Sequence, residues 1–336
     1  MRNLITDVRG LRVGHADDAR VASGVTVAVF EGRATASASV LGGAPGARDT
    51  ALLEPEMAVA KIDAVVLSGG SAFGLDAAGG VAYVLSRRGQ GFEIAGLRVP
   101  IASQAILFDL INGGEKPWLT DSERRRPPYW EMGREAALAV AEDFALGTVG
   151  AGYGANTADL KGGLGSCSTT TSSGHVVGAL VAVNAVGSTV IGDGPHFWAG
   201  ALERGAEFGG LGWPQKVPPA ALAPRFKGGA PPSTTIGLVA TNAPLTKAEC
   251  KRLAIMAHDG LARAVRPAHA PMDGDTLFAA STGRDDARVD PALLTELGLA
   301  AADCVARAIA RGVFEARALP FAGALPAWKD RFAAPR

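Results

Sequence analysis

The sequence has few of the cysteine and histidine residues that bind metal ions or form disulfides in an oxidising compartment. It contains three cysteines in 336 residues. They are far apart and odd in number, so they predict neither a disulfide framework nor a metal site with close ligand spacing. The five histidines are scattered as well. We therefore expect no metal and no cofactor.

An excess of charge and long apolar runs are also missing. The 33 Lys and Arg residues equal the 33 Asp and Glu residues, which gives no electrostatic reason to expect binding to nucleic acid or to an anionic membrane. No apolar run reaches the roughly eighteen residues of a membrane span. The N-terminal segment Met1–Val8 lacks the apolar core of a signal peptide. These absences predict a cytoplasmic protein with neither a membrane nor nucleic acid as its partner.

Aromatic residues are scarce, at 6%, whereas glycine is abundant, with 44 residues. Glycine and alanine let backbones pack closely and turn tightly, as layered sheets require. A strong strand pattern covers residues 176–184, and helices are predicted after the capping box Thr246–Glu249 and after Asp290-Pro291. This alternation of strands and helices predicts an α/β layered protein, and the length suits one large domain.

Other segments have weaker sequence patterns but still predict local structure. Residues 24–30 and 34–41 are predicted as two partner strands because of their β-branched content. A helix is predicted to include residues 54–59. The segment 214–232 is rich in Pro, Ala and Gly, so we expect a mobile surface connection there.

Two glycine-rich segments could approach a ligand closely. A strand at 64–67 runs into a glycine turn before a helix, where Gly70 and Ser71 could cradle a phosphate or the oxygen of a reacting carbonyl. Close packing of that helix on the strand is the alternative interpretation. The array Gly147–Ala155 has the relaxed spacing of a dinucleotide fingerprint, but it follows a helix with almost no room for a strand. We therefore do not predict a dinucleotide site.

The stretch Pro231–Asn242 has the clearest chemical potential. Prolines cannot donate to a β-ladder, so a strand is expected to begin after Pro232. Three hydroxyl residues, Ser233, Thr234 and Thr235, lead into its apolar run. If the bond before Thr234 were cut, the freed α-amine could act as a base for the Oγ of the same residue. The alternative is a loop whose hydroxyls bond only to their own backbone.

The ordered motifs of the chain resemble those of the L-aminopeptidase/D-esterase family, which includes β-peptidyl aminopeptidases and 6-aminohexanoate-oligomer (nylon-oligomer) endohydrolases. The resemblance spans nearly the whole chain and implies a four-layer αββα sandwich. It also implies autocatalytic cleavage of a precursor and an N-terminal nucleophile on the second fragment. The matching segments are residues 5–8, 13–15, 42–46, 67–75, 161–165, 233–236 and 272–278.

Carried onto this chain, the resemblance places the cut between Ser233 and Thr234. It would divide the single domain 1–336 into an α fragment, 1–233, and a β fragment, 234–336, with Thr234 as the nucleophile. Asn184 matches the family asparagine whose amide can donate to a developing oxyanion. The interpretation of Asn184 as a turn residue at a strand end stays open.

Three further residues are implied by the same resemblance. Asp273 and Asp275 match an acidic or polar pair that orients the nucleophile, which suits an α-amine that needs hydrogen-bond acceptors. A solvated turn or a cation loop is the alternative, although the Asp-Gly-Asp motif lacks the remaining ligands of a calcium loop. Lys161 matches a lysine near the nucleophile, where its charge could favour the neutral amine or position Oγ.

The chain departs from the family pattern at two positions. Ser233 stands where many members have Asn or Gly before the nucleophile, which bears on the efficiency of self-cleavage. Phe108 stands where the nylon-oligomer hydrolases contribute a tyrosine near the substrate pocket, so a hydrogen bond from that phenol is absent.

The implied activity is hydrolysis of a small peptide or amide substrate by a homotetramer. Two alternatives remain from the sequence. An acyltransferase of the ornithine acetyltransferase type would pass the acyl group from threonine to an amine. An unprocessed member would keep the fold and act without catalysis.

Overall fold

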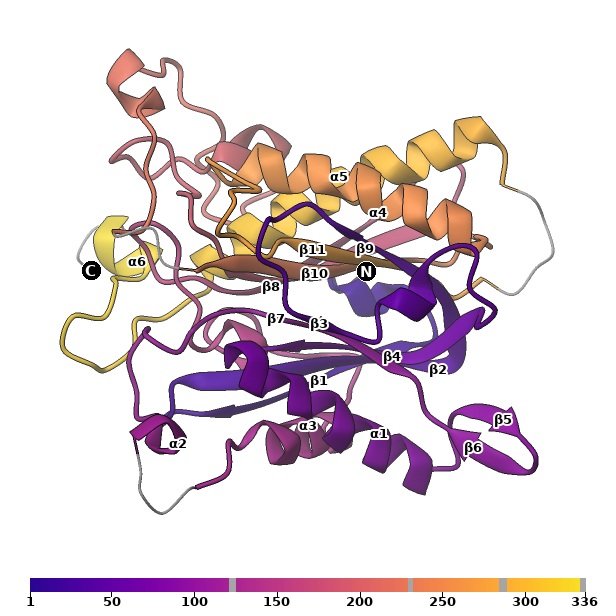
Figure 1. Cartoon of the computed structure of the whole chain (residues 1–336). Helices are drawn as coiled ribbons and strands as arrows, with labels where there is room; N and C mark the ends of the chain where they lie inside the picture. The colour runs from indigo at the N-terminus through magenta and orange to yellow at the C-terminus, as the bar shows by residue number, and fades with distance from the viewer. Residues whose placement is uncertain (121–124, 229–231, 284–288, 333–336) are drawn as a thin grey trace.

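The computed structural model describes residues 1–120, 125–228, 232–283 and 289–332 (Figure 1). Pro231, which was expected to precede the central strand, lies outside these ranges. The strands are β1 (Leu11–Asp18), β2 (Ser23–Val40), β3 (Ala47–Arg48), β4 (Lys61–Ser68), β5 (Phe92–Ile94), β6 (Leu97–Val99), β7 (Ala102–Ile106), β8 (Gly163–Thr170), β9 (Val176–Asn184), β10 (Thr234–Thr241) and β11 (Thr276–Ser281).

The α-helices are α1 (Ala77–Arg87), α2 (Pro117–Thr120), α3 (Tyr129–Leu138), α4 (Lys247–Ala264), α5 (Pro291–Phe314) and α6 (Trp328–Phe332). Short 3-10 helices cover Ile5–Asp7, Ala51–Leu53, Ser71–Asp76, Gly150–Gly152, Trp198–Leu202 and Pro219–Leu222. Within the described ranges, nine strands form one hydrogen-bonded sheet in the order β3-β7-β4-β2-β11-β10-β9-β8, with β1 beside β2. The hairpin β5–β6 is separate from this sheet.

The long strand β2 connects two layers of the sheet. Its first half pairs with β1 and β4, and its second half pairs with β11. The register with β4 shifts between Val29 and Ala34, an irregularity of the kind that bends a strand. The prediction of two partner strands over 24–30 and 34–41 is therefore wrong. They are successive halves of one strand, because the chain bulges between them without reversing its direction.

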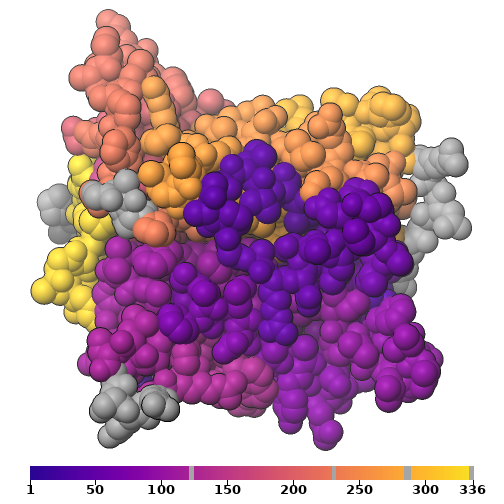
Figure 2. Space-filling model, in the orientation of Figure 1, coloured from indigo at the N-terminus to yellow at the C-terminus, as the bar shows by residue number. Residues whose placement is uncertain are grey.

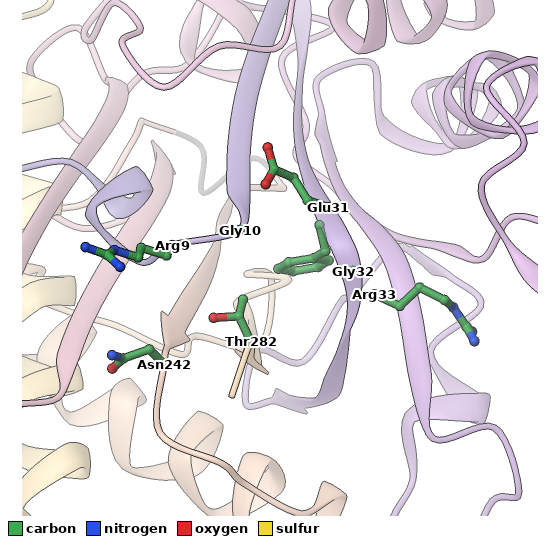
Figure 3. A pocket seen from close by; sticks show the side chains of 8 residues that line it. Arg9, Gly10, Glu31, Gly32, Arg33, Asn242 and Thr282 are labelled. Carbon is green, nitrogen blue, oxygen red and sulfur yellow. The ribbon is translucent and has the colours of Figure 1, made fainter. Parts of the chain in front are cut away.

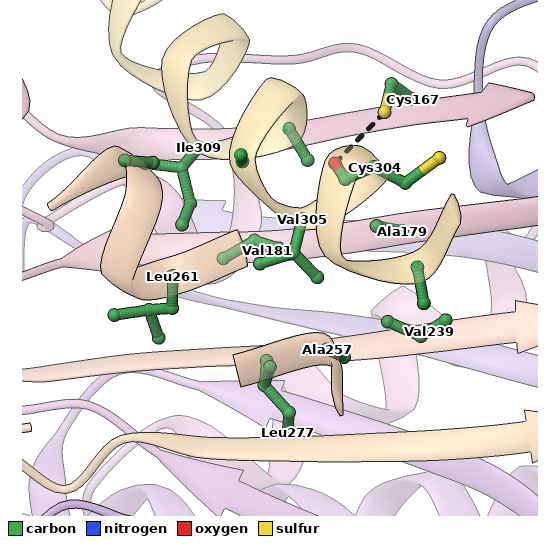
Figure 4. Close-up of a cluster of buried hydrophobic side chains, with 14 of the residues drawn as sticks. Cys167, Ala179, Val181, Val239, Ala257, Leu261, Leu277, Cys304, Val305 and Ile309 are labelled. Atoms are coloured by element: carbon green, nitrogen blue, oxygen red, sulfur yellow. Dashed lines mark hydrogen bonds between the residues drawn. The ribbon is translucent and has the colours of Figure 1, made fainter. Parts of the chain in front are cut away.

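Three hydrophobic cores separate four layers. One lies between α4 and α5 and the outer face of β8–β11 (Figure 4). A second lies between the two sheet layers, and a third lies between the other sheet layer and helices α1 and α3. Figure 1 shows the same order of helices, sheet, sheet and helices. The predicted four-layer αββα sandwich is confirmed.

One other expectation fails for a local reason. Residues 54–59 form no helix: a 3-10 helix ends at Leu53, and Pro55, two residues later, has no backbone N–H to continue it. The segment 214–232 was expected to be a mobile connection, and its described residues touch the body of the protein near Phe226 and Lys227. There Phe226 forms a β-bridge with Gly187, and the Lys227 side chain is buried.

The C-terminal part of the chain is interleaved with the rest. Strands β10 and β11 lie between β2 and β9, so both neighbours come from the N-terminal side of Thr234. Figure 2 shows one face on which the orange C-terminal part meets the violet and magenta N-terminal part directly. Among the described helices, none combines the length and apolar composition that are needed to cross a membrane.

The contact between α4 and α5 generates a stability prediction. A Cβ on Gly260 in α4 would overlap the backbone carbonyl oxygen of Ala302 in α5, whereas a Cβ on Gly298 in α5 would meet only the flexible side chain of Met256. Alanine in a helix interior is favoured over glycine by about 1 kcal/mol, but a steric clash in a packed core costs about 1–3 kcal/mol. Gly260→Ala should therefore lower Tm.

Gly298→Ala is the matched control for this test. It should leave Tm unchanged or raise it slightly, because Met256 can move aside. Thermal unfolding followed by circular dichroism measures both variants. Equal Tm values for the two variants would contradict the close packing of α4 on α5.

Candidate active site

Thr234 is the first residue of β10 and points between the two sheet layers. In the antiparallel ladder it pairs with Asn184, the last residue of β9. Directly opposite residues project from the same face of a sheet, with Cβ atoms about 5 Å apart. This face carries Ile236 and Leu238 of the inter-sheet core, while the neighbouring Thr235 faces the opposite way. The ladder therefore brings the Thr234 hydroxyl and the Asn184 amide together.

The Thr234 hydroxyl lies beside the carbonyl group that precedes it. It donates a hydrogen bond to the carbonyl oxygen of Ser233, and the backbone N–H of Gly274 donates to the same oxygen at 3.0 Å. A Cβ at residue 274 would lie 2.7 Å from the Ala44 carbonyl oxygen and 2.9 Å from Thr234 Oγ1. Glycine at 274 thus allows the loop to approach the hydroxyl closely.

Asp275 is held by three hydrogen bonds. One carboxylate oxygen accepts from the backbone N–H of Thr235 at 2.8 Å. The other accepts from the backbone N–H of His269 at 3.0 Å and faces its ring Nδ1 at 2.9 Å. Asp275 therefore fixes the backbone next to Thr234. Sequence reasoning missed His269, because the scattered histidines carried no spacing signal.

Asp273 differs from Asp275 although it is two residues away. It forms a parallel β-bridge with Ser233, and its carboxylate Oδ1 is buried with no hydrogen-bond partner among the described residues. Burial, and after it the charge of Asp275, raise the pKa of Asp273 to about 7. An acceptor of this kind is suited to receive a new donor close to Thr234.

The Asn184 side chain is held at both ends. Its Nδ2 donates to the backbone carbonyl of Phe108 at 2.8 Å. Its Oδ1 accepts from the Lys227 ammonium at 3.0 Å, from the Asn156 N–H at 3.0 Å and from Asn112 Nδ2 at 3.2 Å. An amide nitrogen carries two hydrogens, so the second hydrogen of Nδ2 can bind a reacting oxygen.

Lys161 is buried, but its bonds go to the backbone of a glycine-rich loop. Its ammonium group donates to the carbonyl oxygens of Gly152, Ala155 and Gly162 at 3.0, 2.6 and 2.9 Å. Burial lowers the pKa of Lys161 to about 7. These bonds hold the loop that carries Asn156, and among the described residues Lys161 makes no hydrogen bond to Thr234.

The residues predicted to bind substrate fall into two groups. Phe108 belongs to the site, because its carbonyl oxygen binds Asn184. The backbone N–H of Gly70 donates to the Asp109 carboxylate at 2.8 Å, and that of Ser71 donates to the Leu107 carbonyl at 3.0 Å. Both groups that could have cradled an oxygen are occupied by the protein, which favours the packing interpretation of this turn.

Sequence reasoning also missed two buried charged residues. Lys227 donates to both the backbone and the side-chain oxygen of Asn184, yet it lies in the segment 214–232, which has no regular pattern. Asp109 is fully buried, and burial raises its pKa. A carboxylate within the otherwise apolar run 105–111 was a signal that could have marked Asp109 as a buried polar group.

A cavity elsewhere in the protein does not coincide with this site. A cavity of about 280 Å³ is lined by Arg9, Glu31, Arg33 and Asn242 among others (Figure 3). It lies at the far end of β10, about 26 Å from Thr234 at about 3.3 Å per residue. In the described part of the chain, no three His, Cys, Asp or Glu side chains are grouped as a metal site would require.

The four-layer fold is shared with a solved aminopeptidase whose fold is described as a variant of the Ntn hydrolase fold. The sequence model of peptidase family S58 matches residues 3–324. The chain belongs to this family, which confirms the resemblance read from its motifs, and it is an amide-hydrolysing enzyme.

Relatives of known name are similar over most of their length. An uncharacterized aminopeptidase from Mycobacterium tuberculosis is 43% identical, with 98% of each chain covered. A 6-aminohexanoate-oligomer endohydrolase from a Kocuria species is 28% identical, over 85% of this chain and 76% of that one.

Two solved structures show the same fold. A β-aminopeptidase from a Burkholderia species aligns with a TM-score of 0.68 at 22% identity. An L-aminopeptidase D-Ala-esterase/amidase from Ochrobactrum anthropi aligns with a TM-score of 0.67 at 20% identity. Each alignment covers 98% of this chain and 92% of the other.

The raised pKa of Asp273 predicts how stability depends on pH. The folded pKa of about 7 lies above the ordinary value of 3.8. Between about pH 4 and 7 the unfolded chain therefore loses the proton first, and stability falls by up to about 1.4 kcal/mol per pH unit as pH rises. Asp273→Asn cannot ionise, so its Tm advantage over the parent should grow across this range and level off above pH 7.

Tm measured against pH in both proteins tests this expectation. Both should carry Thr234→Ala, so that they have the same covalent structure whatever the hydroxyl does. A Tm difference that stays constant from pH 4 to pH 8 would contradict the raised pKa of Asp273.

Proposed function

We propose that the chain cuts itself between Ser233 and Thr234 and then hydrolyses amides with Thr234 as an N-terminal nucleophile. The observation that carries this proposal is the position of the Thr234 hydroxyl. It is buried between the two sheet layers, it donates a hydrogen bond to the Ser233 carbonyl oxygen, and it lies opposite Asn184. A hydroxyl beside the carbonyl that precedes it is arranged for attack on that carbonyl.

Self-cleavage would proceed through an ester. Thr234 Oγ attacks the carbonyl carbon of Ser233, and the N–H of Gly274, which already binds this oxygen at 3.0 Å, stabilises the negative charge on it. The C–N bond breaks as its nitrogen gains a proton, which leaves Ser233 esterified to Oγ. Water then hydrolyses the ester, giving a carboxylate on Ser233 and a free α-amine on Thr234.

Turnover would use the new amine. Thr234 Oγ attacks the substrate amide carbon while its proton passes to the α-amine, and the free hydrogen of Asn184 Nδ2 binds the oxyanion. The amine then protonates the leaving nitrogen, and water releases the acyl group from Oγ. The unpartnered Asp273 Oδ1 would accept a hydrogen bond from the α-amine, and Asp275 would keep the backbone of Thr235 in place.

The substrate we propose is a small peptide or amide with a free amino end. The relative with 43% identity is described as an aminopeptidase, whereas the nylon-oligomer hydrolase shares 28% identity. We therefore favour aminopeptidase activity, with nylon oligomers as the second candidate. Hydrolase names among the relatives favour water over an amine as the acyl acceptor. Assembly as a homotetramer and a cytoplasmic location stay predictions.

The hydroxyl of Thr234 can be tested against that of its neighbour. Thr234→Ala should leave one uncut chain and abolish hydrolysis of an amino-acid p-nitroanilide, because both steps use the same Oγ. Thr235→Val is the matched control, since this buried hydroxyl faces away and has no hydrogen-bond partner among the described side chains. It should still be cut.

Intact mass spectrometry and initial rates measure the two outcomes. The parent chain and Thr235→Val should each give the fragments 1–233 and 234–336, and both should hydrolyse the anilide. Cleavage or turnover by Thr234→Ala would exclude Thr234 as the nucleophile. A single full-length species in an active parent would exclude the self-cleavage step.

A further inference from the structure

Lys227 lies deep in the site although the proposed reaction assigns it no step. Its side chain is 8% exposed. Its ammonium group donates to the Asn184 backbone oxygen at 3.2 Å and to Asn184 Oδ1 at 3.0 Å. The backbone N–H of Lys227 donates to the Val186 carbonyl at 3.0 Å. Both the backbone and the side chain of Lys227 are thus attached to the end of β9.

Lys227 is one of three donors to Oδ1 that fix which way the Asn184 amide faces. The other two are the Asn156 N–H and Asn112 Nδ2. An asparagine side chain can rotate by 180° and exchange its oxygen for its nitrogen at little steric cost. A lysine ammonium can only donate, and so can a backbone N–H. Because Lys227 Nζ and the Asn156 N–H converge on one end of the amide, that end must be the oxygen. The nitrogen then faces the Phe108 carbonyl on the other side.

This orientation matters because only the nitrogen can donate to a negatively charged oxygen. If the amide rotated, Oδ1 would face the Phe108 carbonyl, and two acceptors would repel each other. It would also present a partial negative charge to the oxyanion. A group that fixes the amide therefore determines whether Asn184 stabilises the transition state or destabilises it.

We propose that Lys227 is a positioning residue that acts through Asn184, holding its Nδ2 toward the oxygen of the substrate carbonyl. This role rests on the proposed function, in which Asn184 is an oxyanion donor. Lys227 belongs to the fragment 1–233, so the mature site includes the end of that fragment, seven positions before Thr234.

Lys227 should matter less for self-cleavage than for turnover. The carbonyl oxygen of Ser233 already accepts from the Gly274 N–H, which is independent of Asn184. Lys227→Met, which keeps the length of the side chain and removes its charge, should therefore still be cut into two fragments. This cut also reports that the variant has folded correctly around Thr234.

The expected effect of Lys227→Met on turnover follows from the interactions of Asn184 that the variant keeps. Removing an oxyanion donor outright lowers kcat about 10²- to 10³-fold. Lys227→Met retains Asn184 and the two other donors to its Oδ1, the Asn156 N–H and Asn112 Nδ2. We therefore expect a smaller loss in kcat, about 10- to 100-fold, with KM changed less than about threefold. Lys247→Met is the matched control. Lys247 is 9% exposed, and its ammonium donates to two backbone carbonyls at 2.9 Å, outside the site.

A double-mutant cycle with Asn184→Ala separates a positioning role from a general structural one. The four chains are the parent, Lys227→Met, Asn184→Ala and the double variant, assayed with an amino-acid p-nitroanilide. If Lys227 acts through Asn184, its substitution should lower kcat by less than about threefold once Asn184 is already alanine. Lys247→Met should have the same small effect in both backgrounds.

Several results would overturn the role of Lys227. An unchanged kcat in Lys227→Met would do so, and so would an unchanged kcat in Asn184→Ala. The role would also fail if Lys227→Met lowered kcat equally in the parent and in Asn184→Ala, or if Lys227→Met folded but was not cut. If Lys227→Met does not fold, Lys227→Gln keeps a donor of shorter reach and should show a partial loss that Asn184→Ala again removes. An inert parent chain would overturn the proposed function itself, and an active parent with an active Lys227→Met would overturn only the positioning role.

Discussion

The antiparallel ladder between β10 and β9 is the constraint on which the site depends. It sets Thr234 opposite Asn184 and places both side chains on the inter-sheet face. Both faces of β10 are buried, one against the helices and one against the second sheet layer. A slip of one residue would exchange the two faces and expose every core side chain to the wrong layer. The hydroxyl is therefore located as firmly as the core of the protein.

The site gathers charge where the fold would otherwise bury only apolar groups. Four charged residues of the site are buried: Lys161, Lys227, Asp109 and Asp273. Burial lowers the pKa of the two lysines and raises the pKa of the two aspartates, which favours the neutral form of each. Hydrogen bonds offset the cost of burying three of them. The lysines donate to oxygen atoms of Ala155 and Asn184, and Asp109 accepts from Ser23 and from the backbone of Gly70. Among these four residues, only Asp273 has a charged-group oxygen, Oδ1, without a hydrogen-bond partner in the described part of the chain.

A cut before Thr234 would bring a new donor close to this oxygen of Asp273. A buried acceptor without a donor costs about 1–3 kcal/mol. In the proposed mature enzyme, Thr234 carries an ammonium or amine in place of a peptide N–H, and Asp273 lies beside Ser233 in a β-bridge. Scission would thus supply a donor next to the residue that lacks one, which makes the cut form better satisfied than the uncut form.

The sequence predicted regular elements better than it predicted the polar groups of the site. Residues 176–184 and the two capped helices fold as expected because strong local patterns agree with their tertiary environment. The two halves of β2 were read as separate strands because a bulge and a turn look alike in sequence. Lys227 could not be found, since its role depends on where an irregular segment packs, and no periodicity encodes that.

The interleaved topology explains how a chain could be cut at its centre and keep its shape. Strand β10 begins at the proposed cut, and its ladder to β9 and its parallel ladder to β11 follow on the same side. β11 in turn pairs with β2 of the other fragment. Within β10, both ladders lie on the C-terminal side of the bond between Ser233 and Thr234, so a cut there would not divide either of them. The cut would leave a carboxylate on Ser233 and an amine on Thr234, so it would change the chemistry of Thr234 while both ladders still hold β10 in the sheet.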